Sequence, residues 1–251
     1  MNRGTKEGEI EEKDFCIKFN QRHIELEKTH LFYEKDVYAV HCTQHKYSKI
    51  SEKLVKPKSD SFLIKDLVQQ FSTDTEYINE NELVEGNYKY VVNSGVSVKN
   101  QGSKSYQISK FTFDAFMKVF NNKFLFIGVM VYCKYENELE KNYQIFQDFK
   151  ISEQEFLNAF PGVPSSVSDH KEKLKFIKTQ CIQKIKNFVF ENNNIWNIVY
   201  SGRGVFEDPF FASYFYQDNK IIPISKLESS KISVTNGSGR SRGDYTVVFK
   251  P

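Results

Sequence analysis

The chain has 251 residues, of which 39% are hydrophobic and 27% charged, a balance that is typical of globular proteins and excludes a disordered chain. The 35 basic and 32 acidic side chains leave a net charge of +3, which gives no global argument for binding nucleic acid or an anionic membrane. Four scattered cysteines exclude a disulfide scaffold and indicate reduced thiols in a cytosolic protein. The longest apolar run, residues 124–133, is about half the length that crosses a bilayer, so we expect no membrane contact.

The first segment, residues 5–28, is charged, lacks proline and starts with clustered acidic side chains. Negative charge at a helix start is favourable, so this segment predicts a helix. Its apolar residues, among them Cys16 and Phe19, form an incomplete stripe. We therefore expect residues 1–28 to be a helical arm that either lies on a partner or is solvated.

The following elements are predicted from short apolar patterns and capping residues. Residues 59–71 have a possible serine or aspartate cap and apolar side chains at helical spacing, so they predict a helix. Ser152 and Glu155 form a capping box for a short helix. Ser168 caps the clearest helix, which carries an apolar stripe on one face and lysines on the other. Strands are predicted over residues 37–42, 88–92, 105–113, 124–135, 143–151, 195–200, 210–216, 221–224, 231–235 and 245–249.

These elements alternate irregularly, without the β-α-β rhythm of a parallel sheet. The predicted fold class is α+β: a mainly antiparallel β-sandwich flanked by helices, with a projecting N-terminal helix. We expect residues 29–251 to form a single domain behind the arm of residues 1–28.

Side chains that carry chemistry are sparse. His41, Cys42 and His45 are the only cluster with metal-ligand character, but a second ligand pair is missing and a strand would point His41 and Cys42 to opposite faces. We expect no metal site. No nucleophile motif is present, and none of the cysteines has a catalytic context. We therefore expect no catalytic residues and no enzymatic activity.

Two glycine-rich segments have anion-binding chemistry, namely residues 201–204 and 237–243. Backbone amides, hydroxyls and guanidinium groups can bind phosphate, although the Walker pattern is absent. The simpler interpretation is a pair of exposed β-turns. The candidate nucleotide- or anion-binding residues are Arg203, Ser238, Arg240 and Arg242.

The tyrosines occur in pairs on predicted strand faces, Tyr88 with Tyr90 and Tyr214 with Tyr216. A buried tyrosine packs like phenylalanine but carries a hydroxyl that titrates near pH 10. Ordinary packing of strand aromatics explains most of them. The basic helix face, which includes Lys171 and Lys175, is either solvated, a nucleic-acid contact or a contact to an acidic surface of another copy.

Taken in chain order, these elements resemble those of the cypovirus polyhedrins, the proteins of insect-virus occlusion crystals. The resemblance is one of order and spacing and covers most of the chain. It rests on Gly4-Thr5, Asp14-Phe15, Phe19-Asn20, the strand over 37–42, the helix over 62–71, residues 74–77, residues 88–95, Pro164-Ser165-Ser166, the helix around Cys181, and residues 216–219.

The resemblance implies a structural, non-enzymatic protein that forms homotrimers and packs into crystals in the cytoplasm of infected cells. Virus particles would be the cargo of these occlusion bodies. No cofactor would be required, although a nucleotide could be bound in the lattice. The implied assembly residues are Glu9, Glu12, Phe15, Phe19, Lys171 and Lys175.

Alkaline dissolution also follows from this resemblance, with Tyr88, Tyr90, Tyr214 and Tyr216 as the alkali-sensing groups. Two other functions stay open from the residues themselves. One is a single-stranded nucleic-acid-binding protein with an aromatic β face and a basic helix. The other is a nucleotide-using enzyme built on residues 237–243.

Overall fold

The structure is a computed structural model that describes residues 3–24, 34–72, 74–75, 77–102, 106–131, 139–164, 166–167, 169–226, 231–235 and 245–251. The chain divides into two compact units. The first contains residues 1–106 and 196–229 with Pro251, and the second contains residues 107–195 and 230–250. This division differs from the arm and single domain that the sequence predicts.

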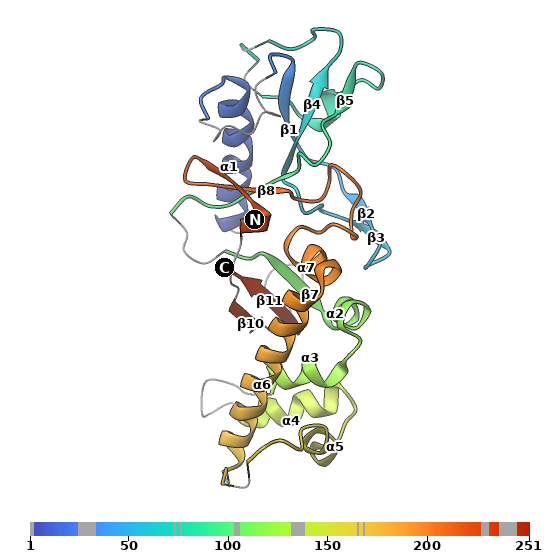
Figure 1. The fold of residues 1–251 in the computed structure, drawn as a ribbon, viewed down its shortest axis with the longest axis vertical. Coiled ribbons are helices and arrows are strands. Elements are labelled where there is room, and N and C mark those ends of the chain that lie inside the picture. The colour runs from blue at the N-terminus through green and yellow to red at the C-terminus, as the bar shows by residue number, and fades with distance from the viewer. Residues whose placement is uncertain are drawn as a thin grey trace. The chain divides into compact units, whose positions relative to one another are not determined.

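The α+β class is confirmed, because helices combine with sheets that are mainly antiparallel (Figure 1). No helix among the described residues is long and apolar enough to span a membrane.

The first unit is built on a six-stranded sheet. Its strands follow the order β1 (Val37–His41), β4 (Ser61–Asp66), β6 (Val96–Val98), β8 (Tyr214–Gln217) and β9 (Lys220–Pro223), with β5 (Tyr88–Tyr90) paired to β4. Neighbouring strands are antiparallel except β6 and β8, which are parallel.

Helix α1 (Arg3–Asn20) packs against this sheet rather than projecting from it. Phe15 and Cys16 are fully buried. The Asn20 side chain fixes the end of the helix to β1, because its Nδ2 donates to the Ala39 carbonyl at 3.1 Å and its Oδ1 accepts from the Ala39 amide at 2.7 Å. The expectation of a projecting helix is therefore wrong: a few large apolar side chains are enough to bury one helix face.

Residues 61–66 form strand β4, not the predicted helix. The strand is central, since β1 pairs along one edge and β5 and β6 along the other, and nearly all its residues are buried. A strand that is buried on both faces is apolar throughout, so its sequence lacks the alternation of apolar and polar residues that identifies a strand. Such a run cannot be distinguished from a buried helix by its pattern.

Smaller elements complete this unit. Strands β2 (Lys46–Ser48) and β3 (Lys53–Val55) form an antiparallel hairpin. Two 3-10 helices are η2 (Glu80–Glu82) and η4 (Ile224–Lys226). Helix α7 (Asn193–Tyr200) begins in the second unit and ends in the first. It replaces the strand predicted over residues 195–200.

The second unit combines helices with a three-stranded antiparallel sheet. The strands are β7 (Ser109–Thr112), β10 (Lys231–Thr235) and β11 (Thr246–Lys250), and the helices are α2 (Phe113–Phe120), α3 (Lys123–Met130), α4 (Leu139–Asp148), α5 (Glu153–Asn158) and α6 (His170–Glu191).

Two predicted strands of this unit are helices, α3 and α4. Asn122 caps α3 by accepting from the Leu125 amide at 3.0 Å, and Gly128 lets α3 approach Cys181 of α6 closely. An apolar run that is buried as a helix looks the same as a buried strand. The cap at Ser152 is confirmed, with Glu155 donating at 3.0 Å, whereas Asp169 caps α6 and Ser168 lies outside the described residues.

Candidate functional site

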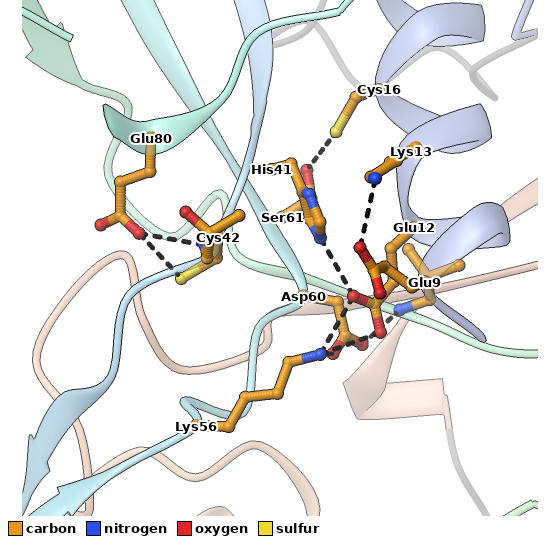
Figure 2. A network of polar contacts seen from close by, with 12 residues as sticks. Glu9, Glu12, Lys13, Cys16, His41, Cys42, Lys56, Asp60, Ser61 and Glu80 are labelled. Atoms are coloured by element: carbon orange, nitrogen blue, oxygen red, sulfur yellow. Dashed lines mark hydrogen bonds and ion pairs between the residues drawn. The ribbon is translucent and has the colours of Figure 1, made fainter. Parts of the chain in front are cut away.

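A network of polar contacts in the first unit gathers side chains from several elements (Figure 2). Glu12 comes from α1 and His41 from the end of β1. Lys56 and Asp60 lie between β3 and β4, and Lys99 directly follows β6. We call Glu12, Lys56, Lys58, Asp60 and Lys99 the carboxylate–lysine cluster.

Glu12 is the best connected member. Its side chain is 12% exposed, its Oε2 lies 3.1 Å from His41 Nε2, and Lys56 Nζ lies 3.0 Å from both carboxylate oxygens. Burial raises the pKa of Glu12, but the His41 hydrogen bond and the Lys56 ammonium outweigh burial and leave it below its usual value. Glu12 is therefore an ionised carboxylate at neutral pH.

Asp60 is the second carboxylate. Its Oδ2 accepts from Ser97 Oγ at 3.0 Å and from the Val98 amide at 2.9 Å, while its Oδ1 lies 3.7 Å from Lys56 Nζ. Burial raises the pKa of Asp60, and the negative charge of Glu12 adds to this, against the opposing effect of Lys99. Two carboxylates that disfavour each other's ionisation thus share one ammonium group.

The two remaining lysines of the cluster, Lys58 and Lys99, have lowered pKa values. Lys99 Nζ donates to Ser97 Oγ at 2.6 Å, which joins it to Asp60 through the serine hydroxyl. Burial lowers the pKa of Lys99. Burial also lowers the pKa of Lys58 to about 7, with the nearby Lys99 charge acting in the same direction. The Lys58 amine can therefore accept a proton near neutral pH.

His41 holds the Glu12 carboxylate through a hydrogen bond. The ring is 4% exposed, and its Nδ1 lies 2.6 Å from the Tyr77 hydroxyl. With Nε2 on Glu12 and Nδ1 on Tyr77, both ring nitrogens are used. Cys42 Sγ instead donates to Glu80 Oε2 at 3.7 Å, so His41 and Cys42 have separate partners.

The described cysteines are poor nucleophiles. Cys16, Cys42 and Cys181 are free and buried. Burial raises the pKa of Cys16 and of Cys181 to about 12, and it raises the pKa of Cys42 as well. The thiols stay protonated at neutral pH, and covalent thiol chemistry is not favoured at these three positions.

Glu80 forms a separate group of polar contacts next to the carboxylate–lysine cluster (Figure 2). Its Oε2 accepts from the amides of Thr43 at 3.1 Å and Gln44 at 2.9 Å, and its Oε1 contacts Lys46 Nζ. Both oxygens of the Glu80 carboxylate have hydrogen-bond partners within the protein. Glu80 therefore has a structural effect, because it fixes the loop after β1 and the start of the β2–β3 hairpin.

Of the predicted anion-binding residues, Arg203 is the one within the described part of the chain. Arg203 packs over the Phe211 ring at 4.4 Å and donates from Nη2 to Asn93 Oδ1 at 2.6 Å. Its partners in the prediction, Ser238, Arg240 and Arg242, lie outside the described residues.

The tyrosine pairs have different environments. The hydroxyls of Tyr88 and Tyr90 are 3.4 Å apart, and Tyr90 is 41% exposed. Tyr214 is half-buried, whereas Tyr216 is buried and donates to Asn219 Oδ1 at 3.0 Å. Burial raises the pKa of Tyr90, Tyr214 and Tyr216.

The predicted assembly residues of α1 mostly serve their own unit. Phe15 and Phe19 are core side chains and Glu12 belongs to the cluster, while Glu9 pairs with Lys13 at 3.1 Å on the surface. On α6, Lys175 lies 3.6 Å from Glu172, and Lys171 sits in the first turn.

Sequence reasoning missed Lys56, Lys58, Asp60 and Lys99. The available signal was the run Lys56-Pro57-Lys58-Ser59-Asp60, in which two lysines precede an aspartate at the start of an apolar strand. Nothing in the sequence shows that Glu12 and Lys99 meet this run, since they arrive from other elements.

Comparison with known proteins adds little. No family model and no curated protein matches the sequence. A crystal structure of the restriction endonuclease MspI in complex with its cognate DNA is similar over 86% of this chain and 70% of that chain, at 12% sequence identity and a TM-score of 0.33. A likeness this weak carries no argument about fold or function.

Proposed function

We propose that the carboxylate–lysine cluster is the active site of a divalent-cation-dependent hydrolase that cleaves phosphodiester bonds. One observation carries this proposal: two carboxylates from separate elements converge on a single ammonium group, beside two amines whose pKa values are lowered. Perturbed groups gathered from several elements are typical of functional sites.

The donor set suits a magnesium ion. Magnesium is usually held by one or two carboxylates, with water and substrate phosphate oxygens completing its shell. The Lys56 ammonium lies between Glu12 and Asp60 and marks a position that favours positive charge. Within the described residues no group of three or more His, Cys, Asp or Glu side chains could hold a metal ion, so a cation at Glu12 and Asp60 would need water and substrate oxygens at its other positions.

The remaining side chains fit hydrolysis. Bound at the two carboxylates, a divalent cation would stabilise the charge that develops on the phosphate. Lys99, held beside Asp60 through Ser97, accepts the proton of the attacking water. The water oxygen bonds to phosphorus, the bond to the leaving oxygen breaks, and the leaving oxygen takes up a proton from solvent. Burial opposes the charge of Lys56, but the carboxylates of Asp60 and Glu12 raise its pKa, so Lys56 provides positive charge for the phosphate oxygens.

The competing interpretation is a structural ion network. Such networks also perturb pKa values. Burial lowers the pKa of Lys58 to about 7, so its ammonium form costs folding stability, and this cost favours a functional role over a purely structural network.

The test is hydrolysis of plasmid DNA and of RNA with Mg²⁺ or Mn²⁺, compared with EDTA. We expect Asp60→Asn to reduce the rate at least 100-fold. The matched control is Asp36→Asn, which removes an exposed carboxylate that lies 3.3 Å from Lys65 Nζ in the same unit, and it should leave the rate unchanged. A wild-type protein that hydrolyses neither polymer with either metal would overturn the proposal.

The occlusion-body function stays a second proposal, favoured by the half-buried Tyr214 and the buried Tyr216, whose pKa values burial raises. Deleting residues 1–28 would also remove the core residues Phe15 and Phe19, so it cannot isolate an assembly role. The direct test is expression in insect cells, with light microscopy for cytoplasmic crystals and turbidity as the pH passes about 10.5. A diffuse, soluble protein would contradict this second proposal.

A further inference from the structure

Three strands in the sheet of the first unit, β1, β5 and β9, each pair with one neighbouring strand and therefore have a second edge (Figure 1). A bare edge can bind another strand, so proteins usually cover or interrupt it. On β1, the Asn20 side chain covers the edge, because it bonds both the N–H and the C=O of Ala39. On β9, Pro223 interrupts the edge, since proline has no backbone N–H. Strand β5 contains no proline, and no described side chain bonds to its backbone in this way.

The hydrogen bonding of β5 shows which of its backbone groups face outward. Directly after the strand, the Val91 amide donates to the Leu63 carbonyl of the β4 segment at 3.0 Å. Backbone groups alternate in direction along a strand, so Lys89, two residues earlier, also bonds toward β4. Tyr88 and Tyr90 therefore direct their N–H and C=O groups to the outer edge, where no strand of the described chain pairs with them.

The tyrosine side chains determine what one face of an added strand would contact. Tyr88 and Tyr90 lie on the same face of β5, and their rings pack edge to face with centroids 5.3 Å apart. Tyr90 also packs against the buried Phe62, at 5.5 Å between centroids, yet stays 41% exposed. Aromatic and β-branched side chains stabilise each other across neighbouring strands. This face therefore favours β-branched residues on an added strand.

The opposite face of β5 carries a lysine. Lys89 is exposed, and its cross-strand neighbour on β4 is Lys65. Lys65 pairs with Glu34 at 2.6 Å and with Asp36 at 3.3 Å, whereas Lys89 forms no ion pair with the residues that the structure describes. A carboxylate on an added strand opposite Lys89 is therefore favourable. A second copy of β5 is disfavoured, because symmetric antiparallel pairing would place the two Lys89 side chains opposite each other.

We propose that β5 is a docking site for an extended strand of another protein. The strand adds to the sheet in antiparallel orientation beside Tyr88–Tyr90, with β-branched side chains next to the two tyrosines and a carboxylate next to Lys89. Backbone donors and acceptors at strand spacing are matched by another polypeptide strand, and the side chains at alternate positions give specificity. No residue of this edge belongs to the carboxylate–lysine cluster, so the inference does not depend on the proposed function.

The test is titration of the full chain into a fluorescein-labelled, C-terminally amidated peptide, Thr-Val-Glu-Val-Thr, followed by anisotropy. We expect saturable binding below about 1 mM. In the proposed register the valine N–H groups donate to the Tyr88 and Tyr90 carbonyls, so methylating both valine nitrogens should weaken binding at least about tenfold. The glutamate N–H faces away from β5, so methylating that nitrogen should leave the affinity unchanged.

The charge preference is tested by reversal at Lys89. Lys89→Glu should weaken binding of this peptide about tenfold and strengthen binding of Thr-Val-Lys-Val-Thr by a similar factor. The matched control is Lys220→Glu, which changes an exposed lysine on β9, the strand that Pro223 interrupts, and it should leave both affinities unchanged. Both substitutions are at the surface, so thermal unfolding should confirm that each variant is folded.

Three results would overturn the inference. The first is absence of peptide binding up to about 1 mM, or equal binding of the unmethylated and the valine-methylated peptides. The second is an equal effect of Lys89→Glu and Lys220→Glu, which would exclude β5 as the site. The third is a wild-type dimer in analytical ultracentrifugation that Lys89→Glu alters and Lys220→Glu does not, which would identify a second copy as the occupant. None of these results changes the hydrolysis assay, so failure here is distinct from failure of the proposed function.

Discussion

Replacing Lys58 with methionine should stabilise the protein at neutral and mildly acidic pH. Burial lowers the pKa of Lys58 from 10.5 to about 7, so the ammonium form is disfavoured in the folded state. Between these two pH values the unfolded chain holds the proton and the folded chain releases it, so stability rises with pH. Below pH 7 the folded state carries the charge, and the destabilisation reaches its full size.

The magnitude follows from the displacement of the pKa. Each pKa unit corresponds to about 1.4 kcal/mol, so the penalty is about 5 kcal/mol below pH 7 and vanishes above pH 10.5. Lys58→Met keeps an unbranched chain and removes the charge. We expect it to raise the free energy of unfolding by several kcal/mol at pH 6 and by little at pH 10.

The assay is urea unfolding of wild type and variant at intervals from pH 6 to pH 10, with the difference between the two curves as the measured quantity. Lys49→Met, at an exposed position, is the control and should give a curve parallel to that of the wild type. A Lys58→Met curve that is also parallel, or a variant less stable than wild type at pH 6, would refute the reasoning.

Three further predictions concern the cluster and its surroundings. Lys99→Arg keeps the charge but cannot accept a proton, so the rate of phosphodiester hydrolysis should fall at least 100-fold. His41→Asn removes the support of Glu12, and the Mg²⁺ concentration for half-maximal hydrolysis should rise about 10-fold or more, with circular dichroism showing an intact fold. Burial raises the pKa of Tyr216 in the folded state. The stability that Tyr216 contributes is therefore present below about pH 10 and is lost as the pH rises through its folded-state pKa. Tyr216→Phe should flatten this alkaline loss of stability, measured by urea unfolding between about pH 9 and pH 11.

Each of these three predictions would be contradicted by a specific result. Full hydrolysis by Lys99→Arg would exclude Lys99 as the proton acceptor. An unchanged metal requirement in His41→Asn would show that Glu12 needs no support, and an unchanged alkaline slope in Tyr216→Phe would assign the loss to other groups.

Local signals in the sequence predicted much of the fold. Strand β1 and the helix cap at Ser152 depend on neighbours in the chain, and the structure confirms both. Strand β4 and helices α3 and α7 were assigned the wrong type, because their apolar runs are buried and burial removes the alternation that separates strand from helix.

The candidate site was harder to predict for a different reason. Glu12, Asp60 and Lys99 belong to separate segments, and only the packing of α1 on the sheet and the ends of β3 and β6 brings them together. In the sequence, Glu12 looked like one of several acids at a helix start. Its burial against His41 and Lys56 distinguishes it from Glu9, and burial of that kind depends on tertiary contacts.

The interleaved division of the chain has a consequence for synthesis on the ribosome. Strand β6 of the first unit pairs with β8, and strand β7 of the second unit pairs with β11, so both sheets are completed by residues beyond position 213. Until those residues emerge, each nascent sheet has an unpaired strand edge, which is a site for aggregation. A chain that stops after α6 would leave both units incomplete, so the protein should be sensitive to C-terminal truncation throughout rather than in one unit alone.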